Sequence, residues 1–402
     1  MKRVLFVDDE PNVLSGLRRM LRYFRDQWEM EFAEGGTKAL GVLQHWPADV
    51  IVTDMRMPGM DGAELLGEVR RRWGGMVRIV LSGQCDRQSV IRALGPIHQF
   101  LTKPCEVERL QSTVARACRL RDRLPDETDR QLVSRVTVLG SRPSLYQAFA
   151  SELDARGASI ARLGHSAARD PAMALRVLQL VNSGFFGTPQ NTSRPEHAAN
   201  LLGLDLLRPL VHDARAIAPL DPPDVLRDAL ETLFDHSQAV AKLARRIALD
   251  VTGDESLAAE AYLGGLLHDV GLLLLAQESP ERAEGLLAAS WLRGEPILRI
   301  ERQQYTATHA ELGAYLAGLW GLSEVVVDAV ARHHEPPTGE SPRFDAAAAV
   351  WLANALDDQQ RFGWTEQETP LDDECVRRLG WADRLDAWRA VCCHEIAEGT
   401  VR

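Results

Sequence analysis

The sequence predicts a multidomain protein in which an α/β unit with a parallel sheet precedes an all-α region. Two observations lead to this prediction. Up to about residue 120, short apolar runs of strand length alternate with helical stretches, which is typical of a parallel sheet covered on both faces. From about residue 138 onward, the chain shows helical periodicity and little strand signal.

Composition limits the class of protein. A length of 402 residues allows two or three domains, and 45% hydrophobic with 26% charged residues is ordinary for a soluble globular chain. The net charge of −11 makes the chain as a whole a poor nucleic-acid binder, so DNA is not an expected partner. No apolar run reaches the roughly 18 residues of a membrane helix. The six cysteines form no CxxC pair, so we expect a reduced, cytoplasmic protein without a membrane partner.

Four apolar runs of the first part each end in a polar or charged side chain. The residues at those ends are Asp8, Asp9, Asp54, Ser82 and Lys103. Functional groups gather beyond the carboxyl ends of parallel strands, and a bound Mg²⁺ would relieve the repulsion between three carboxylates. A carboxylate beside a divalent metal and a lysine can form an aspartyl phosphate. An acidic residue that merely ends a strand is the simpler explanation for one such residue, but not for five in order.

These residues lie in motifs that resemble the receiver domain of two-component response regulators: VLFVDDEPNVLSGL, IVTDMRMPGMDG, VLSG and FLTKP. The resemblance covers residues 1–122. It implies a flavodoxin-like fold with a five-stranded parallel sheet and a sensor histidine kinase as partner. It also implies roles for single residues. Asp54 would be the phosphoacceptor, Asp8, Asp9 and the backbone carbonyl of Arg56 would bind Mg²⁺ with it, Ser82 and Phe100 would be switch residues, and Lys103 would contact the phosphate.

Residues 123–137 follow as a predicted linker. The preceding stretch, residues 106–122, keeps an apolar stripe and is expected to be the last helix of the α/β unit. The linker is polar and contains Pro125, so it is either a hinge or a signalling helix between domains. A surface helix followed by a loop is the alternative.

The helical region carries histidines at positions where an apolar helix face is expected. Asp170 is predicted to cap a helix that starts at Pro171, and Gly203 to end another helix. The polar residues that point toward a shared interior are His236, His268, Asp269, His309, His333 and His334. Neutral imidazoles with one carboxylate suit a transition metal such as Fe, Mn, Zn or Ni. The alternative is a set of buried histidines that hydrogen-bond to each other and to the backbone.

Four blocks in this region resemble the HDOD domain, an HD-related output domain of bacterial signalling proteins: DPAMALRVLQLVNSGFFG, AANLLGLDLLRPLV, AYLGGLLHDVGLLLL and HAELGAYLAGLWGLSEVVVDAVARHHEPP. We assign residues 138–342 to it and residues 343–402 to a helical extension packed on it. The histidines also follow the order found in HD-GYP phosphohydrolases. However, Leu272 stands where those enzymes have lysine, the GYP triplet is absent, and the late aspartate appears as Asn354, with Asp357 three residues off.

The sequence therefore leaves three functions open. The first is a response regulator that is phosphorylated on Asp54 and controls a non-catalytic HDOD domain acting through protein–protein interaction, with a homodimer as one form. The second is a metal-dependent phosphohydrolase of the cyclic-dinucleotide phosphodiesterase type. The third is a binding module whose HD-type pocket senses a nucleotide, a cyclic dinucleotide or a metal without hydrolysis.

Overall fold

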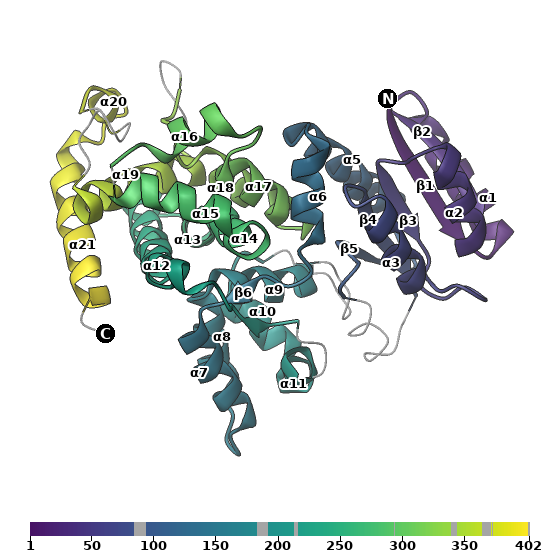
Figure 1. Ribbon diagram of the computed structural model, residues 1–402, viewed down its shortest axis with the longest axis horizontal. Coiled ribbons are helices and arrows are strands. Elements are labelled where there is room, and N and C mark those ends of the chain that lie inside the picture. Colours follow the sequence, from purple (N-terminus) through teal and green to yellow (C-terminus); the bar gives the residue numbers. More distant parts are fainter. Residues whose placement is uncertain are drawn as a thin grey trace.

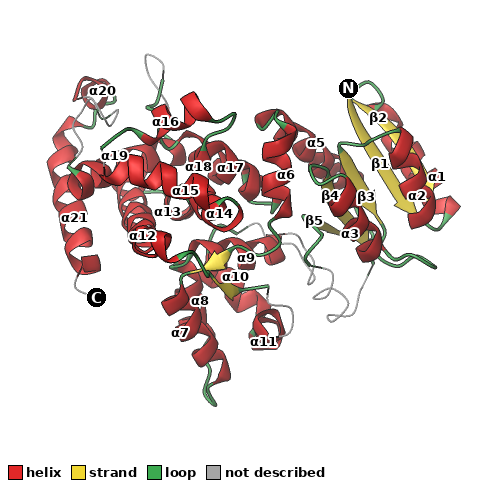
Figure 2. Ribbon diagram, in the orientation of Figure 1, coloured by secondary structure: helices red, strands yellow, loops and turns green. Residues whose placement is uncertain are grey.

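Two parts are visible in the computed structural model, which describes residues 1–83, 94–182, 192–212, 216–292, 294–338, 344–363, 371 and 373–400. A sheet with flanking helices lies at one end and a larger helical part at the other, with α5 and α6 between them (Figure 1). Figure 2 shows that all strands except one short pair belong to the first part. The predicted fold class is confirmed.

The N-terminal part is built on one five-stranded parallel sheet with the strand order β2-β1-β3-β4-β5. Its strands are β1 (Lys2–Asp8), β2 (Trp28–Glu34), β3 (Val50–Thr53), β4 (Val77–Ser82) and β5 (Gln99–Thr102). Four strands coincide with the apolar runs of the sequence: β1, β3 and β4 lie inside the sheet and are covered on both faces, and β5, although at an edge, is buried from Gln99 to Leu101. The exception is β2, an edge strand in which exposed glutamates alternate with apolar residues.

Helices connect these strands. They are α1 (Pro11–Met20), a 3₁₀ turn (Leu21–Phe24), α2 (Gly36–His45), α3 (Gly62–Arg72) and α5 (Val107–Arg123). Helix α3 begins with a capping box: Asp61 accepts from the Glu64 backbone N–H, and the Glu64 side chain accepts from that of Asp61. A Cβ atom at Gly62 would overlap the carbonyl oxygen of Asp54, so a glycine is needed there. The start of α3 thereby lies directly against the carboxyl end of β3.

The predicted linker contains a short helix. α5 ends at Arg123, and α6 (Glu127–Arg135) follows, with the Asp126 side chain accepting two backbone N–H groups at its start. The buried Arg78 of β4 donates to the Ser134 carbonyl at 2.9 Å, which ties α6 to the sheet. The side chain of Asp129 in α6 accepts from the Thr306 hydroxyl at 2.5 Å. Helix α6 therefore contacts both parts of the protein.

The second part is almost entirely helical. Its helices are α7 (Pro143–Asp154), α8 (Ile160–Ala168), α9 (Pro171–Asn182), α10 (Pro195–Leu202), α11 (Leu204–His212), α12 (Asp224–Thr252), α13 (Glu255–Leu267), α14 (Val270–Glu278), α15 (Pro280–Leu287), a π-helical turn (Ala288–Leu292), α16 (Ile297–Gln304), α17 (His309–Leu319), α18 (Glu324–Arg332), α19 (Ala346–Phe362), α20 (Asp373–Arg378) and α21 (Ala382–Thr400). A pair of two-residue strands, β6 (Gly140–Ser141) and β7 (Ala218–Pro219), was not predicted.

The two predicted helix ends are confirmed. Helix α9 starts at Pro171, and Asp170 accepts from the Met173 backbone N–H at 2.8 Å. Helix α10 is followed by Gly203 with a φ of 69°, a value that favours glycine.

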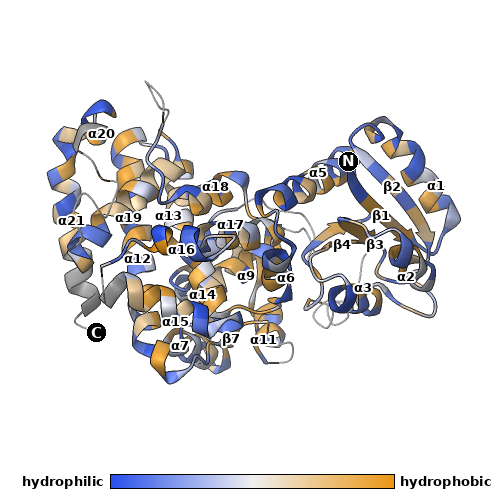
Figure 3. Ribbon diagram, turned by 45° about the horizontal axis from the view of Figure 1, so that its top comes forward, coloured by the Kyte–Doolittle hydropathy of each residue, from blue (hydrophilic) through white to orange (hydrophobic). Residues whose placement is uncertain are grey.

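The core of the helical part is strongly apolar. Polar and apolar residues alternate along surface helices such as α1 and α5 (Figure 3), whereas α14 is buried from Val270 to Ala276. The stretch Glu255–Glu278 is long and apolar enough to cross a membrane by length and composition alone, although no such run was expected. However, 78% of its most apolar window is buried inside the protein, as in the core helix of a soluble domain.

Candidate functional site

One candidate site lies at the carboxyl end of the parallel sheet. The Lys103 ammonium, just after β5, lies 2.7 Å from the Asp8 carboxylate and 2.5 Å from the Asp54 carboxylate. Asp8 is buried and Asp54 half-buried, whereas the neighbouring Asp9 is exposed. Backbone N–H groups hold the two inner carboxylates: that of Glu10 donates to Asp8 at 3.0 Å, and that of Arg56 donates to Asp54 at 2.6 Å.

The charges at this edge stabilise one another. Burial alone would lower the pKa of Lys103, but its hydrogen bonds to Asp54 and Asp8 raise that pKa above the usual value, so the lysine stays cationic. A set of carboxylate oxygens beside one ammonium group has the hard ligands that Mg²⁺ prefers. Of the residues predicted for Mg²⁺ binding and phosphate contact, Asp8, Asp54 and Lys103 are thus brought together.

The two predicted switch residues lie on neighbouring strands. Phe100 is buried in β5, next to β4, which Ser82 ends. The side chain of Ser82 lies outside the described part of the structure.

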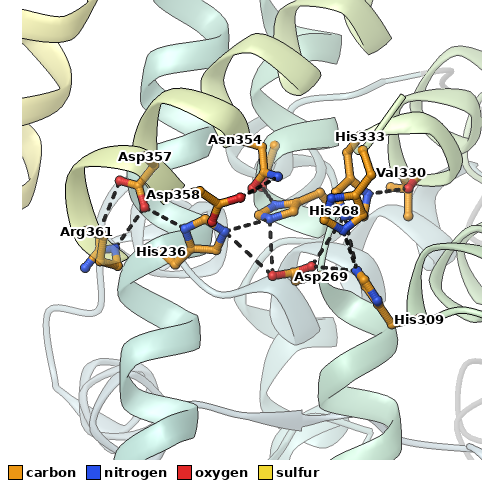
Figure 4. A network of polar contacts seen from close by, with 12 residues as sticks. His236, His268, Asp269, His309, Val330, His333, Asn354, Asp357, Asp358 and Arg361 are labelled. Atoms are coloured by element: carbon orange, nitrogen blue, oxygen red, sulfur yellow. Dashed lines mark hydrogen bonds and ion pairs between the residues drawn. The ribbon is translucent and has the colours of Figure 1, made fainter. Parts of the chain in front are cut away.

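A second candidate site lies inside the helical part, where all six predicted residues meet (Figure 4). His236 comes from α12, His268 and Asp269 from the junction of α13 and α14, His309 from the first turn of α17, and His333 with His334 from the end of α18. Asp269 lies between two groups. One contains His236 and His268, and the other contains His309, His333 and His334.

The five histidines and Asp269 together form the histidine cluster. The Nε2 atoms of its rings face one another. His236 and His268 approach to 3.0 Å, His309 and His333 to 3.2 Å, and His334 and His309 to 3.1 Å, each between Nε2 atoms. One oxygen of Asp269 lies 3.2 Å from His309 Nε2, and the other lies 3.3 Å from His268 Nε2. Two facing Nε2 atoms can share at most one proton in a hydrogen bond.

The outward-facing Nδ1 atoms explain which tautomers these rings adopt. His268 Nδ1 donates to the Gly265 carbonyl and His333 Nδ1 to the Val330 carbonyl, both at 2.7 Å. His236 Nδ1 lies 2.6 Å from the carboxylate of Asp357. Because a carbonyl or carboxylate only accepts, each of these Nδ1 atoms carries a proton, and the neutral form of each ring would present an Nε2 lone pair inward.

His309 follows the same pattern, with Glu301 of α16 as its partner. The Glu301 carboxylate accepts from both the backbone N–H of His309, at 2.7 Å, and its Nδ1, at 2.8 Å. Four inward lone pairs and one carboxylate, each ring oriented by an outer acceptor, are what a metal-binding histidine set requires. The residues present therefore fit a transition metal.

Protonation is the other way to satisfy the cluster. Burial would lower the pKa of His309, but Glu301 and Asp269 raise it to about 10, so without a metal this ring is an imidazolium that donates to Asp269. Burial lowers the pKa of His333 to about 4, so this ring stays neutral. Although burial opposes it, His268 and the other histidines hold the pKa of Asp269 well below its ordinary value. A bound metal ion would take the place of the proton that His309 donates to Asp269.

Sequence reasoning missed the outer partners of the cluster. Glu301 was not considered, and Asp357 was set aside because it lies three residues from the expected position. Asp357 instead orients His236 and pairs with Arg361 at 2.8 Å. Asn354, at the expected position, donates to Asp358 at 3.2 Å, and its buried Oδ1 has no hydrogen-bond partner among the described residues.

Two further features limit the charge at this site. Leu272 is buried, and its position supplies no cation to bind phosphate. Burial, with repulsion from Asp357 and Asp269, raises the pKa of Asp358 well above its ordinary value, so that this side chain is a neutral acid. Asp269 is therefore the carboxylate that faces the inward Nε2 atoms of the cluster.

Comparison with known families matches both parts of the chain. Residues 4–115 match the family model of the response regulator receiver domain, and residues 139–336 match that of the HDOD domain.

Single relatives cover less of the chain. The hydrogenase transcriptional regulatory protein HoxA of Cupriavidus necator is 38% identical over 116 residues, which are 28% of this chain and 23% of HoxA. An uncharacterized protein of Treponema pallidum is 29% identical over 186 residues, which are 46% of this chain and 36% of that protein. The matched regions thus span from about a quarter to about a third of these relatives.

Solved structures also resemble parts of the chain. The signal receiver domain of an HD domain-containing protein from Pseudomonas fluorescens is 26% identical, with 30% of this chain and 97% of that chain covered and a TM-score of 0.29. The MmoQ response regulator of Methylococcus capsulatus is 24% identical, with 63% and 98% covered and a TM-score of 0.47.

Proposed function

Because the chain is a response regulator that joins an N-terminal receiver domain to a C-terminal HDOD domain, we propose that phosphorylation of Asp54 controls which surface the HDOD domain offers to a protein partner. A receiver domain implies a histidine kinase as the phosphodonor. Asp8, Asp9, Asp54 and the backbone carbonyl of Arg56 would hold Mg²⁺, which would supply positive charge beside the phosphoryl oxygens. Lys103 would contact the phosphoryl oxygens, and Ser82 and Phe100 would respond to them.

The proposal is supported by the contact between the receiver domain and α17. Gln99, the first residue of β5, donates from Nε2 to the carbonyls of Gly318 (3.2 Å) and Leu319 (3.1 Å). These carbonyls end α17, where helices leave such groups unpaired. Gln99 directly precedes the switch residue Phe100, so a change at Phe100 would reach this hydrogen-bonded pair without an intermediate element.

Helix α5 extends the same contact. Arg116 donates to the Leu322 carbonyl at 3.0 Å, and Arg123 pairs with Asp328 at 2.6 Å. A Cβ atom at Gly318 would overlap the side chain of Leu120, so the two helices approach as closely as a glycine permits. The β5–α5 face is thus covered by α17 and α18 in this structure.

We propose that phosphorylation releases this face. A phosphoryl group is a local electrostatic change that biases an element with two arrangements. Release would uncover α17 and α18 for a downstream protein and the β5–α5 face for a second copy of the chain. The output is then non-catalytic, and a homodimer forms only in the released state.

Small-angle X-ray scattering tests this proposal on the full chain. Beryllofluoride with Mg²⁺, which mimics an aspartyl phosphate, should increase the radius of gyration of the wild type and leave that of Asp54→Ala unchanged. An equal change in both proteins, or no change in either, would contradict it.

The domain limits and the location follow from this function. We propose a receiver domain at residues 1–122, a linker at 123–137, the HDOD domain at 138–342 and a packed extension at 343–402. We also propose a cytoplasmic location, because histidine kinases draw on cytoplasmic ATP.

A second candidate function is favoured by the four outward-facing Nδ1 atoms of the histidine cluster. His236, His268, Asp269, His309, His333 and His334 would hold one or two transition-metal ions such as Fe, Mn, Zn or Ni. Such a metal would lower the pKa of a bound water and attract phosphate oxygens. Because Leu272 supplies no cation to bind phosphate, we propose that this site binds a nucleotide-like ligand, and we rank phosphodiester hydrolysis below binding.

Elemental analysis of purified, tag-free protein tests the metal. About one or two equivalents, absent in His268→Ala, would support the site. If the wild type holds no transition metal, even after incubation with Mn²⁺ or Zn²⁺, the metal site is contradicted. The cluster would then be satisfied by protonation alone.

A further inference from the structure

A cavity of about 400 Å³ opens beside the histidine cluster and is lined by residues of both domains. Arg123 comes from the receiver helix α5, Arg302 and Tyr305 from α16 and the residue after it, and Arg332 and His334 from the end of α18. His334 is half-buried, and its Nε2 lies 3.1 Å from His309 Nε2. The cavity therefore reaches the histidine cluster at His334.

The charges around this cavity favour an anion. Arg123, Arg302 and Arg332 converge from three elements, and Arg302 has no ion-pair partner within the described ranges of the chain. Among the described residues, the acidic partners of Arg332 are Glu335 at 4.0 Å and Asp345 at 3.8 Å, both near the limit of an ion pair. Arg302 and Arg332 therefore keep N–H donors for phosphate oxygens, which a guanidinium group can bind in a bidentate manner, whereas Arg123 also pairs with Asp328 and Glu324.

The acidic residues of the cavity weaken this field little. Glu311 is engaged in the cap of α17, where its carboxylate accepts from the Thr308 backbone at 2.8 Å and hydroxyl at 3.1 Å. Glu335 is exposed and lies beside Arg332. A volume of about 400 Å³ is within the range of small-molecule sites.

We infer that this cavity binds a phosphate-bearing small molecule, and that the receiver domain completes the site with Arg123. The inference rests on the proposed release of the receiver domain and states what that release does to this site. Arg123 is held by Asp328 at 2.6 Å and Glu324 at 3.6 Å, both on α18. When α5 leaves α18, the site loses one of its three guanidinium groups.

Two further contacts link the cavity to the receiver side. Thr306, in the cavity wall, donates to Asp129 of α6 at 2.5 Å. Helix α17 also spans both regions, because it begins at His309 in the histidine cluster and ends at Leu319, which Gln99 binds. Coupling between two sites is reciprocal, so a ligand that prefers the docked arrangement also opposes release.

Titration of the full chain with inorganic pyrophosphate, in a constant excess of Mg²⁺ and followed by calorimetry, tests this inference. Arg302→Gln and Arg123→Gln should each weaken pyrophosphate binding by about tenfold, the loss of one charge-assisted contact. Arg119→Gln is the matched control, since Arg119 lies on α5 and faces Glu324 at 3.6 Å but does not line the cavity. Its affinity should equal that of the wild type.

Beryllofluoride should weaken pyrophosphate binding to the wild type as much as Arg123→Gln does, and should add nothing in that variant. Wild-type binding weaker than about 1 mM, or equal affinity in Arg302→Gln and the wild type, would overturn the site. If beryllofluoride leaves the affinity for pyrophosphate unchanged while scattering still shows release of the receiver domain, the coupling would be overturned. The proposed function would then remain intact. Absence of release in the scattering experiment would instead remove the proposed function itself.

Discussion

The imidazole of His236 and the carboxylate of Asp357 form a buried pair, with Nδ1 2.6 Å from Oδ2, although the two residues are 121 positions apart in the chain. The pair fixes which nitrogen of His236 faces the cluster. Although burial opposes it, hydrogen bonds from His236 and Arg361 hold the pKa of Asp357 below its ordinary value, so the partner of the ring is a carboxylate. The adjacent Asp358 is a neutral acid, which gives a matched comparison.

Asp357→Asn should destabilise the protein more than Asp358→Asn. The first change removes a charge-assisted hydrogen bond inside the protein, which contributes roughly 1.5–3 kcal/mol. The second replaces a neutral acid by a neutral amide of the same shape and should cost less than about 1 kcal/mol. Urea unfolding of the metal-free protein measures both. Equal losses would argue against the assigned charge states.

The metal-free protein should lose stability as the pH rises from 6.5 toward 10. The folded-state pKa of His309 is raised to about 10 from 6.5, so its contribution is complete below pH 6.5 and disappears as the ring loses its proton near pH 10. His309→Gln should flatten this dependence. Thermal unfolding across this range, after treatment with a chelator, provides the measurement, and an unchanged slope in the variant would contradict the assignment.

Gly271→Ala should destabilise the fold by roughly 1–3 kcal/mol, since a new methyl group in a packed contact must displace its neighbours. A Cβ atom there would overlap the carbonyl oxygen of His309, because α14 and α17 are in close contact. Gly285→Ala is the control: it lies within α15 with no atom within 4 Å of the new Cβ, and alanine favours a helix. Its stability should equal or exceed that of the wild type.

Gly318→Ala should weaken the contact between the domains without phosphorylation. The added methyl group would overlap Leu120 of α5, and its three nearest atoms all belong to that side chain of the receiver domain. We expect partial release of the receiver domain in the absence of beryllofluoride, detected as a larger radius of gyration. Gly67→Ala, on α3 with no neighbour within 4 Å of the new Cβ, should behave like the wild type.

The sequence predicted those elements whose signal is local. Buried strands such as β3 are continuous apolar runs, and their polar ends mark the predicted phosphorylation site. The edge strand β2 was not predicted because its exposed positions are glutamates, which also occur in helices and loops. The histidines were found because each is a polar residue within an otherwise apolar helix.

The partners of these residues could not be predicted, because they depend on how helices pack. Glu301 and Asp357 are ordinary acidic residues of α16 and α19 until the fold places them beside His309 and His236. The bond from Gln99 to Gly318 joins residues 219 positions apart, and neither carries a sequence signal for an interface.

Hydrogen–deuterium exchange of the full chain, with and without beryllofluoride, tests most directly the central claim that phosphorylation of Asp54 frees the β5–α5 face from α17 and α18. Amides of α5 and of the end of α17 should exchange faster in the presence of beryllofluoride, and Asp54→Ala should show no change. Unchanged or slower exchange at these helices in the wild type, with the Asp54 site itself responding, would contradict the claim.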